Sequence, residues 1–315
     1  MPSKSYTKQW IPYEAQVQKL EERGLQINDR PKAIRFLSHL NYYRFSGYCL
    51  AFEKQRHTFE KDTTFEQIVE AYHFDKGLRE LMIVGLGQIE VELRALIAYE
   101  FGRSYGAFGH YDFGNFYTPN TSDELAKATS DHSNWVNGLG GEVGRSKEKF
   151  VTHFESSYQE HPKLPIWMVT ELMSFGATSR MLSALKTEDK KKISTKYKIQ
   201  PKVFCSWIHH LVYVRNICAH HSRLWDKFWS IKPELPPSKT WRKLDGEGNL
   251  IIKSHRLLAT LFIIRYMLKR STGLPEQAAI WKKRVEVHME NPPTVSDWMA
   301  KTGFVDNWRL NPIWN

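Results

Sequence analysis

Helical periodicity is the feature that most constrains what this chain can fold into. Between about residues 75 and 102, apolar side chains recur at spacings of three and four, so they share one face of a helix. This face comprises Leu78, Met82, Ile89, Leu93, Leu96 and Ile97. Glu90 and Arg94 lie four residues apart on the same segment, which predicts an intrahelical ion pair of structural value. Because convincing strand alternation is limited to short pieces, the sequence predicts a mainly all-α fold.

Local signals give approximate helix boundaries. The stretch Asp29–Pro31 is typical of a helix start, and that helix would run to about Leu40. Thr64–Gln67 fits a capping box that opens another helix, and a second start is expected at Asp75. Further helices are expected at about 147–159, at 166–185 with an interruption at Gly176, at 253–269 and at 275–289.

The helical signals divide the chain into three regions. Residues 1–62 form an N-terminal helical region, residues 63–230 a helical bundle, and residues 231–315 a C-terminal helical extension. Residues 107–145 are rich in Gly, Asn, Ser and Thr, so we expect a loop-rich insertion with short helical pieces within the bundle. Prolines at 233, 236 and 237 and the turn sequence 245–249 predict a linker before the extension, with a short hairpin at the turn.

The amino-acid composition indicates which kinds of binding partner and which cellular compartment to expect. Lys and Arg outnumber Asp and Glu by 45 to 34, and this excess favours polyanionic partners such as RNA. Three cysteines in 315 residues do not make a disulfide framework. The first ten residues contain no apolar signal segment, and no apolar run approaches the ~18 residues of a membrane span. We therefore expect a cytoplasmic protein with no membrane contact.

A cluster of polar, titratable residues interrupts an apolar helix that Pro201 opens and that reaches His220 or His221. Because unpaired buried charge is costly, the cluster is expected to face a cleft or an interface. Arg215 offers forked donors that fit phosphate oxygens, and His220 titrates near neutral pH, so it can act as general acid or base. Asn216 shares a helix face with His220. RNA can be cleaved without a metal because its own 2′-OH attacks phosphorus, and these residue types suit that reaction.

Two other interpretations of the cluster remain open. Cys205 and His209 are spaced four apart, and Cys218, His220 and His221 add further donors for a metal ion. The sequence lacks a paired C-x-x-C or an H-E-x-x-H, however, so this signal is weak. Alternatively, the helix is simply packed and its histidines satisfy local hydrogen bonds.

The segment from Arg215 to Trp225 resembles the signature of the Abi-like abortive infection proteins, the AbiD/AbiF group. Several upstream segments resemble further blocks of the same family in the same order, so that the resemblance covers roughly residues 15–225. These segments are 25–29, 41–48, 65–68, 72–75, 78–79 and 89–94. The extension beyond about residue 230 is not covered.

The resemblance implies a fold, an activity and partners. The family belongs to the HEPN superfamily, which implies a HEPN-type helical bundle over residues 63–230 and an RNA-cleaving motif. The motif carries over to Arg215, Asn216 and His220, with His221 as an adjacent alternative. It further implies a homodimer through the motif helices, a role in phage defence, and for some members a small non-coding RNA partner, as in toxin–antitoxin systems whose antitoxin is RNA. No metal and no cofactor are implied.

Five side chains outside the catalytic set are further candidates for contact with RNA. Aromatic rings can stack on unpaired bases, and arginines bind phosphates. These candidates are Tyr42, Tyr43, Arg44, Arg79 and Arg223. Tyr42–Arg44 can equally be a turn packed on the bundle. At the level of the whole protein, the alternatives to an endoribonuclease are a non-catalytic RNA-binding scaffold and a nucleotidyl transferase, for which no clear acidic metal-binding partner occurs.

Overall fold

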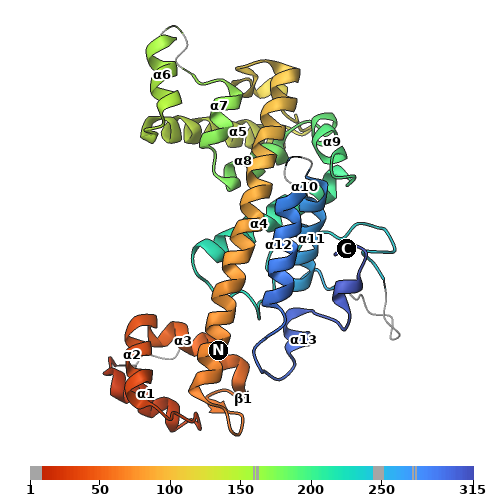
Figure 1. Cartoon of the computed structure of the whole chain (residues 1–315). Helices are drawn as coiled ribbons and strands as arrows, with labels where there is room; N and C mark the ends of the chain where they lie inside the picture. Colours follow the sequence, from red (N-terminus) through yellow and green to blue (C-terminus); the bar gives the residue numbers. More distant parts are fainter. Residues whose placement is uncertain (1–8, 159, 161–162, 244–251, 272, 274) are drawn as a thin grey trace.

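The computed structural model describes residues 9–158, 160, 163–243, 252–271, 273 and 275–315 (Figure 1). Within these residues almost all regular structure is helical, which confirms the mainly all-α prediction. The sheet they contain is a two-stranded antiparallel hairpin of β1 (Glu53–Gln55) and β2 (Thr58–Phe59). In the same residues, no helix has both the length and the apolar character of a membrane span. The expected turn at 245–249 lies outside the described residues.

One helix, α4 (Phe65–Tyr105), runs through the whole molecule (Figure 1). It begins with the predicted capping box, in which Thr64 and Gln67 bond reciprocally. Its 41 residues correspond to about 60 Å. The expected second helix start at Asp75 is wrong, because Asp75 points into the protein on the buried face of a continuous helix.

The N-terminal helices lie at one end of α4 (Figure 1). They are α1 (Tyr13–Glu21), α2 (Arg30–Leu40) and α3 (Tyr42–Cys49). Asp29 caps α2 by accepting a 2.8 Å hydrogen bond from the backbone of Lys32, so the helix starts where the sequence predicted. A short 3-10 turn (Leu50–Phe52) then leads into the hairpin.

Helices also cover the other end of α4. They are α5 (Ser122–Arg145), α6 (Lys149–Ser157), α7 (Ile166–Leu172), α8 (Phe175–Ala184) and α9 (Thr187–Thr195). The expectation of short helical pieces in the insertion is wrong for α5, a helix of 24 residues that contains four glycines. Trp135, Leu139 and Val143 recur every four residues and pack on the core, and this packing outweighs the low helix propensity of glycine. The break near Gly176 instead falls at Ser174, whose hydroxyl caps α8.

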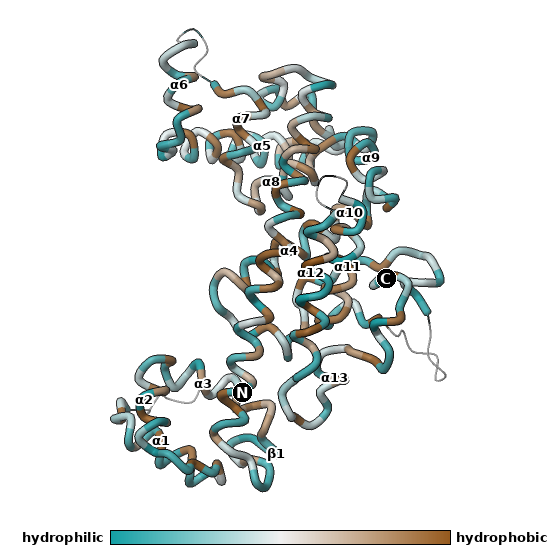
Figure 2. Tube along the Cα trace, viewed as in Figure 1, coloured by the Kyte–Doolittle hydropathy of each residue, from teal (hydrophilic) through white to brown (hydrophobic). Residues whose placement is uncertain are grey.

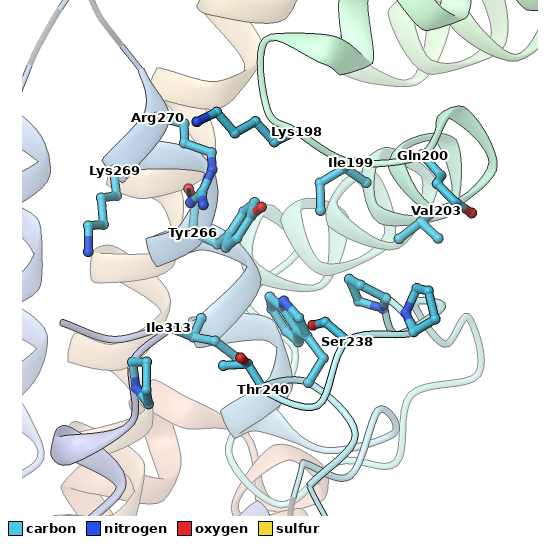
Figure 3. Close-up of a pocket in the computed structure, with 14 residues that line it drawn as sticks. Lys198, Ile199, Gln200, Val203, Ser238, Thr240, Tyr266, Lys269, Arg270 and Ile313 are labelled. Atoms are coloured by element: carbon cyan, nitrogen blue, oxygen red, sulfur yellow. Dashed lines mark hydrogen bonds between the residues drawn. The ribbon is translucent and has the colours of Figure 1, made fainter.

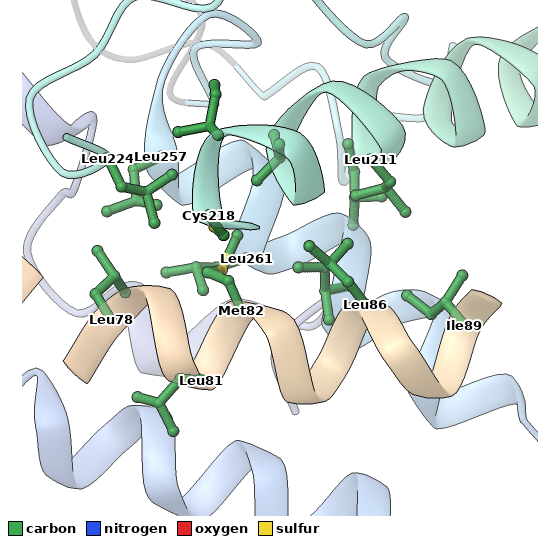
Figure 4. Close-up of a cluster of buried hydrophobic side chains, with 14 of the residues drawn as sticks. Leu78, Leu81, Met82, Leu86, Ile89, Leu211, Cys218, Leu224, Leu257 and Leu261 are labelled. Atoms are coloured by element: carbon green, nitrogen blue, oxygen red, sulfur yellow. The ribbon is translucent and has the colours of Figure 1, made fainter. Parts of the chain in front are cut away.

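The core forms where α10 (Pro201–Ala219), α11 (Leu257–Arg270) and α12 (Pro275–His288) meet α4. Figure 4 shows Leu211 and Cys218 of α10 facing Met82 and Leu86 of α4. The hydrophobic segments in Figure 2 gather along the same contact. The chain ends with α13 (Trp298–Thr302) and a 3-10 turn (Trp308–Leu310).

Two glycines let α12 approach α4 closely. A Cβ on Gly85 would lie 2.7 Å from the Trp281 indole nitrogen, and a Cβ on Gly77 would lie 2.8 Å from the His288 ring. The Trp281 indole N–H donates to the carbonyl oxygen of Leu81 at 2.8 Å. The C-terminal extension therefore contacts the backbone of α4 directly.

Candidate active site at the end of helix α10

Helix α10 ends in a Schellman motif that fixes the backbone of the candidate histidines. The N–H of Ser222 donates to the Ile217 carbonyl at 2.9 Å, and the N–H of His221 donates to the Cys218 carbonyl at 3.0 Å. His221 has φ of 53°, in the left-handed region where glycine is the usual residue. His220 caps the helix, and both histidine side chains are exposed. The helix end matches the predicted boundary.

Arg215 lies half-buried against α4. Its Nε is 3.8 Å from Oε2 of Glu90, whose other carboxylate oxygen accepts from Arg94. Arg215 also donates to the side-chain oxygen of Asn216 at 3.2 Å. The predicted Glu90–Arg94 pair is confirmed, and the same carboxylate also braces Arg215. Asn216, one turn before His220, is exposed on the same side of the helix.

A buried carboxylate on α4 holds the loop that follows the motif. Asp75 accepts from the backbone N–H of Leu224 at 3.1 Å and of Trp225 at 2.8 Å. It also accepts from the Tyr48 hydroxyl at 2.7 Å and pairs with Arg79. Burial raises the pKa of Asp75, while Arg79, Tyr48 and the two backbone N–H groups act in the opposite direction. Asp75 thereby fixes the chain a few residues after His220.

Several candidate RNA contacts instead bind the protein itself. Arg79 is buried in its pair with Asp75, so its guanidinium faces the core and not a surface phosphate. Arg44 donates to the carbonyl of His221, and Arg223 donates to the carbonyl of Gly47. These two reciprocal contacts join α3 to the end of the motif.

The two tyrosines of the candidate set differ in exposure. Tyr42 is half-buried, and its hydroxyl accepts from Arg23 at 3.1 Å. Tyr43 is 87% exposed, so its ring is free to stack on a partner. Of the five candidates, Tyr43 is thus the one whose aromatic face is fully presented to solvent.

The possible metal donors do not converge. Within the described residues, no group of three or more His, Cys, Asp or Glu side chains could hold a metal ion. Cys218 is buried, and burial raises the pKa of its thiol to about 12. His209 is exposed, whereas the neighbouring His210 is buried and bonded to Ile231 and Thr260.

An aromatic hollow lies beside α10 before the motif. Its volume is about 770 Å³, and its lining includes Phe116, Trp135, Arg180 and His209. His209 precedes Asn216 by seven residues, which is two helical turns and about 10 Å along the same face of α10.

Sequence reasoning did not assign a role in the site to Asp75 or to the Glu90–Arg215 contact. A signal for Asp75 is nevertheless present, because Asp75 and Arg79 lie four residues apart on an otherwise apolar helix face. A charge pair on a buried face is retained when it bonds other groups as well.

One comparison with known proteins finds a match, and it covers the same stretch. No curated protein and no solved structure matches the chain. A family model described as Abi-like protein matches residues 35–226, which is 192 of the 315 residues. The match runs from α2 through the whole of α4 to the loop that Asp75 holds. Because it spans more than half of the chain and includes the complete motif, the chain belongs to the family of Abi-like proteins.

Proposed function

We propose that this protein is a metal-independent endoribonuclease of the HEPN type that acts in phage defence. Membership of the Abi-like family suggests a role in abortive infection. The observation that carries the enzymatic part is the group of half-buried Arg215 with exposed Asn216 and His220. Glu90 of α4 contacts Arg215, and Asp75 holds the loop that follows His220. Groups held in place by their surroundings need little reorganisation during a reaction.

The reaction follows from the chemistry of these groups. The 2′-OH of RNA attacks the adjacent phosphorus, and the bond from phosphorus to the 5′-oxygen breaks. Arg215 stabilises the negative charge on the phosphoryl oxygens, because a guanidinium donates two parallel hydrogen bonds to phosphate. His220 removes the 2′-OH proton or protonates the leaving oxygen, and Asn216 orients the phosphate. The products carry a 2′,3′-cyclic phosphate and a 5′-OH.

A single motif at an exposed helix end does not enclose a substrate. A second copy of the protein would complete the site. The face of α4 beside Glu90 exposes an apolar stripe, defined by Ile83, Val84 and Val91. Gly87 lies within this stripe, with no atom close to where its Cβ would be. Apolar stripes on a helix are favourable association surfaces. Pairing two copies there would bring two motifs together across the interface and exclude water from both.

The test is cleavage of single-stranded RNA by the purified full-length protein in EDTA. We expect cyclic-phosphate and 5′-OH ends, with Arg215→Ala and His220→Ala each lowering the rate about 10²–10⁴-fold. His209→Ala is the matched control, because His209 is an exposed histidine on the same helix and outside the motif. Cleavage that EDTA abolishes, or that survives both motif substitutions, contradicts the proposal.

A second candidate function is an RNA-binding scaffold that forms a ribonucleoprotein with a small structured RNA. The 87% exposed ring of Tyr43 and the net charge of +11 favour it. The two functions are compatible if the bound RNA restrains the nuclease. Sequencing the RNA that copurifies with the Arg215→Ala, His220→Ala double variant tests the scaffold, since one dominant small RNA is expected. If Tyr43→Ala leaves its yield unchanged, this ring is not its contact.

A further inference from the structure

A cavity of about 490 Å³ lies between the C-terminal extension and the segment that precedes α10 (Figure 3). Lys198, Ile199 and Gln200 line one side, the end of α11 lines another, and residues 236–238, 240–241 and 312–313 close it. Most of this lining lies beyond residue 226, so the extension completes a cavity that the family-matched region only begins.

Positive charge is concentrated in the lining of the cavity. Within the part of the chain that the structure describes, this lining includes Lys198, Lys269 and Arg270 and no Asp or Glu. Among the described residues, none of these three cations forms an ion pair. Burial lowers the pKa of Lys269, and the nearby charges of Arg265, Arg270 and Lys282 lower it further. Uncompensated positive charge of this kind attracts an anion.

Arg270 is held in position with donors to spare. Its guanidinium lies 3.4 Å from the centre of the Tyr266 ring, and it donates to the Tyr266 carbonyl at 3.3 Å. Its Nε is buried and has no hydrogen-bond partner among the residues that the structure describes. In Figure 3 the Lys198 side chain extends toward the end of α11 that carries Arg270. Two cations from separate parts of the chain therefore flank one opening.

The remaining wall is apolar. Trp241, which is 3% exposed, packs edge-on against Tyr266 with ring centres 5.7 Å apart, and Ile313 and three prolines continue the surface. The hydroxyl of Tyr266 donates to the Tyr197 carbonyl at 3.1 Å, which fixes the ring. Ser238 and Thr240 add hydroxyls at the edge. A rigid apolar wall with a few polar groups is typical of a small-molecule site.

We propose that this cavity, whose lining combines Lys198, Lys269 and Arg270 with an apolar wall, binds a phosphorylated nucleotide. The phosphate bonds the cations, and the nucleoside lies against the apolar side chains of the wall. The volume is within the range of about 300–1,000 Å³ that is usual for small-molecule sites. Val203, at the edge of the cavity, precedes Arg215 by twelve residues, or about 18 Å along α10. The site is therefore separate from the motif. Its nucleotide is either a free molecule or part of an RNA strand.

Calorimetric titration of the full-length protein with adenosine 5′-monophosphate tests the site independently of RNA cleavage. We expect adenosine 5′-monophosphate to bind. Adenosine alone and inorganic phosphate alone should each bind at least about ten-fold more weakly, because each lacks half of the contacts. The double variant Lys198→Glu, Lys269→Glu should weaken binding about ten-fold or more. The control Lys191→Glu, Lys283→Glu makes the same charge change on exposed surfaces elsewhere and should bind normally.

A second arm identifies the source of the nucleotide. An eight-residue oligoadenylate is titrated into His220→Ala protein, with and without the Lys198→Glu, Lys269→Glu change. Loss of oligonucleotide binding assigns the site to an RNA strand, and loss of mononucleotide binding alone assigns it to a free nucleotide. The proposal is overturned if millimolar adenosine 5′-monophosphate does not bind, if both double variants bind it equally, or if an acidic peptide binds more tightly. Lys198→Ala, Lys269→Ala replaces the charge reversal if thermal unfolding shows that the first variant is destabilised.

Discussion

The Asp75 carboxylate accepts a 2.8 Å hydrogen bond from the backbone N–H of Trp225, 150 residues later in the chain. Asp75→Asn removes the charge that Arg79 faces and substitutes an amide N–H for an acceptor. We expect the free energy of unfolding to fall by about 3–5 kcal/mol, and RNA cleavage to fall at a temperature where the variant is still folded. Urea unfolding and a cleavage assay measure the two effects.

Tyr48→Phe is the graded comparison for this prediction. It removes the 2.7 Å bond from the hydroxyl to Asp75 and the 3.1 Å bond that the hydroxyl accepts from Arg79, but leaves the carboxylate in place, so we expect a loss of about 1–2 kcal/mol in the free energy of unfolding. If Asp75→Asn costs no more than Tyr48→Phe, the carboxylate does not hold the loop.

The substitution His221→Gly distinguishes the roles of His220 and His221. His221 has φ of 53°, a conformation that costs an L-residue about 1 kcal/mol and a glycine little. We therefore expect His221→Gly to leave the free energy of unfolding unchanged or raise it by up to about 1 kcal/mol, and to retain cleavage. Because the backbone carbonyl that Arg44 contacts is preserved, loss of cleavage in this variant would assign the chemistry to His221 instead of His220.

Glu90 is expected to position Arg215. Glu90→Gln removes the charge that braces this arginine, and a misplaced catalytic group loses rate, so we expect cleavage to fall about ten-fold. Glu92→Gln is the control on the same helix, because Glu92 pairs with Lys196, away from the motif. Single-turnover rates should separate the two variants, and equal rates would mean that Arg215 holds its position without Glu90.

A charged substitution in the apolar stripe of α4 tests whether two copies associate through this surface. Val91 is 61% exposed, and Val91→Glu should prevent association by burying an unpaired carboxylate. Sedimentation velocity should give a monomer, and cleavage should fall with it. Val287→Glu makes the same change at an exposed valine of α12 and should leave both properties intact. A dimer that persists in Val91→Glu protein excludes this stripe as the interface.

Stability should fall in mild acid because His210 is buried in its neutral form. Burial lowers its pKa to about 4, and the Ile231 carbonyl fixes the ring proton on Nδ1. Between pH 6.5 and 4 the unfolded chain binds the proton more readily, so the free energy of unfolding decreases as the pH falls, by up to about 3 kcal/mol. His210→Gln cannot titrate, so we expect a smaller decrease between pH 7 and 4.5 in urea unfolding. Parallel curves for the two proteins would contradict this assignment.

Helix starts and ends that depend on residues close together in the sequence could be predicted from local signals. The capping box at Thr64, the Asp29 cap and the end of α10 all involve groups within five residues, and each was predicted correctly. The 24 residues of α5 were not, because the composition rich in glycine and serine hid the regular spacing of Trp135, Leu139 and Val143.

Contacts between distant parts of the chain could not be predicted from spacing. Arg44 and Arg79 read as surface cations in the sequence, yet one bonds the His221 carbonyl and the other pairs with Asp75 in the interior. Only the tertiary fold brings α3 and the start of α4 to the end of α10. The sequence predicts Arg215, Asn216 and His220 as the motif, whereas the contacts that Glu90 and Asp75 make with this region come from the tertiary structure.

The glycines at 77 and 85 make α12 inseparable from α4. Because these glycines have no side chain, His288 and Trp281 of α12 pack directly on α4 there, and both residues lie beyond residue 226. A fragment trimmed to residues 35–226 would expose bare backbone and apolar surface along this seam. Expression of the family-matched segment alone should therefore yield aggregated protein, and recombinant work on this chain requires all of its helices together.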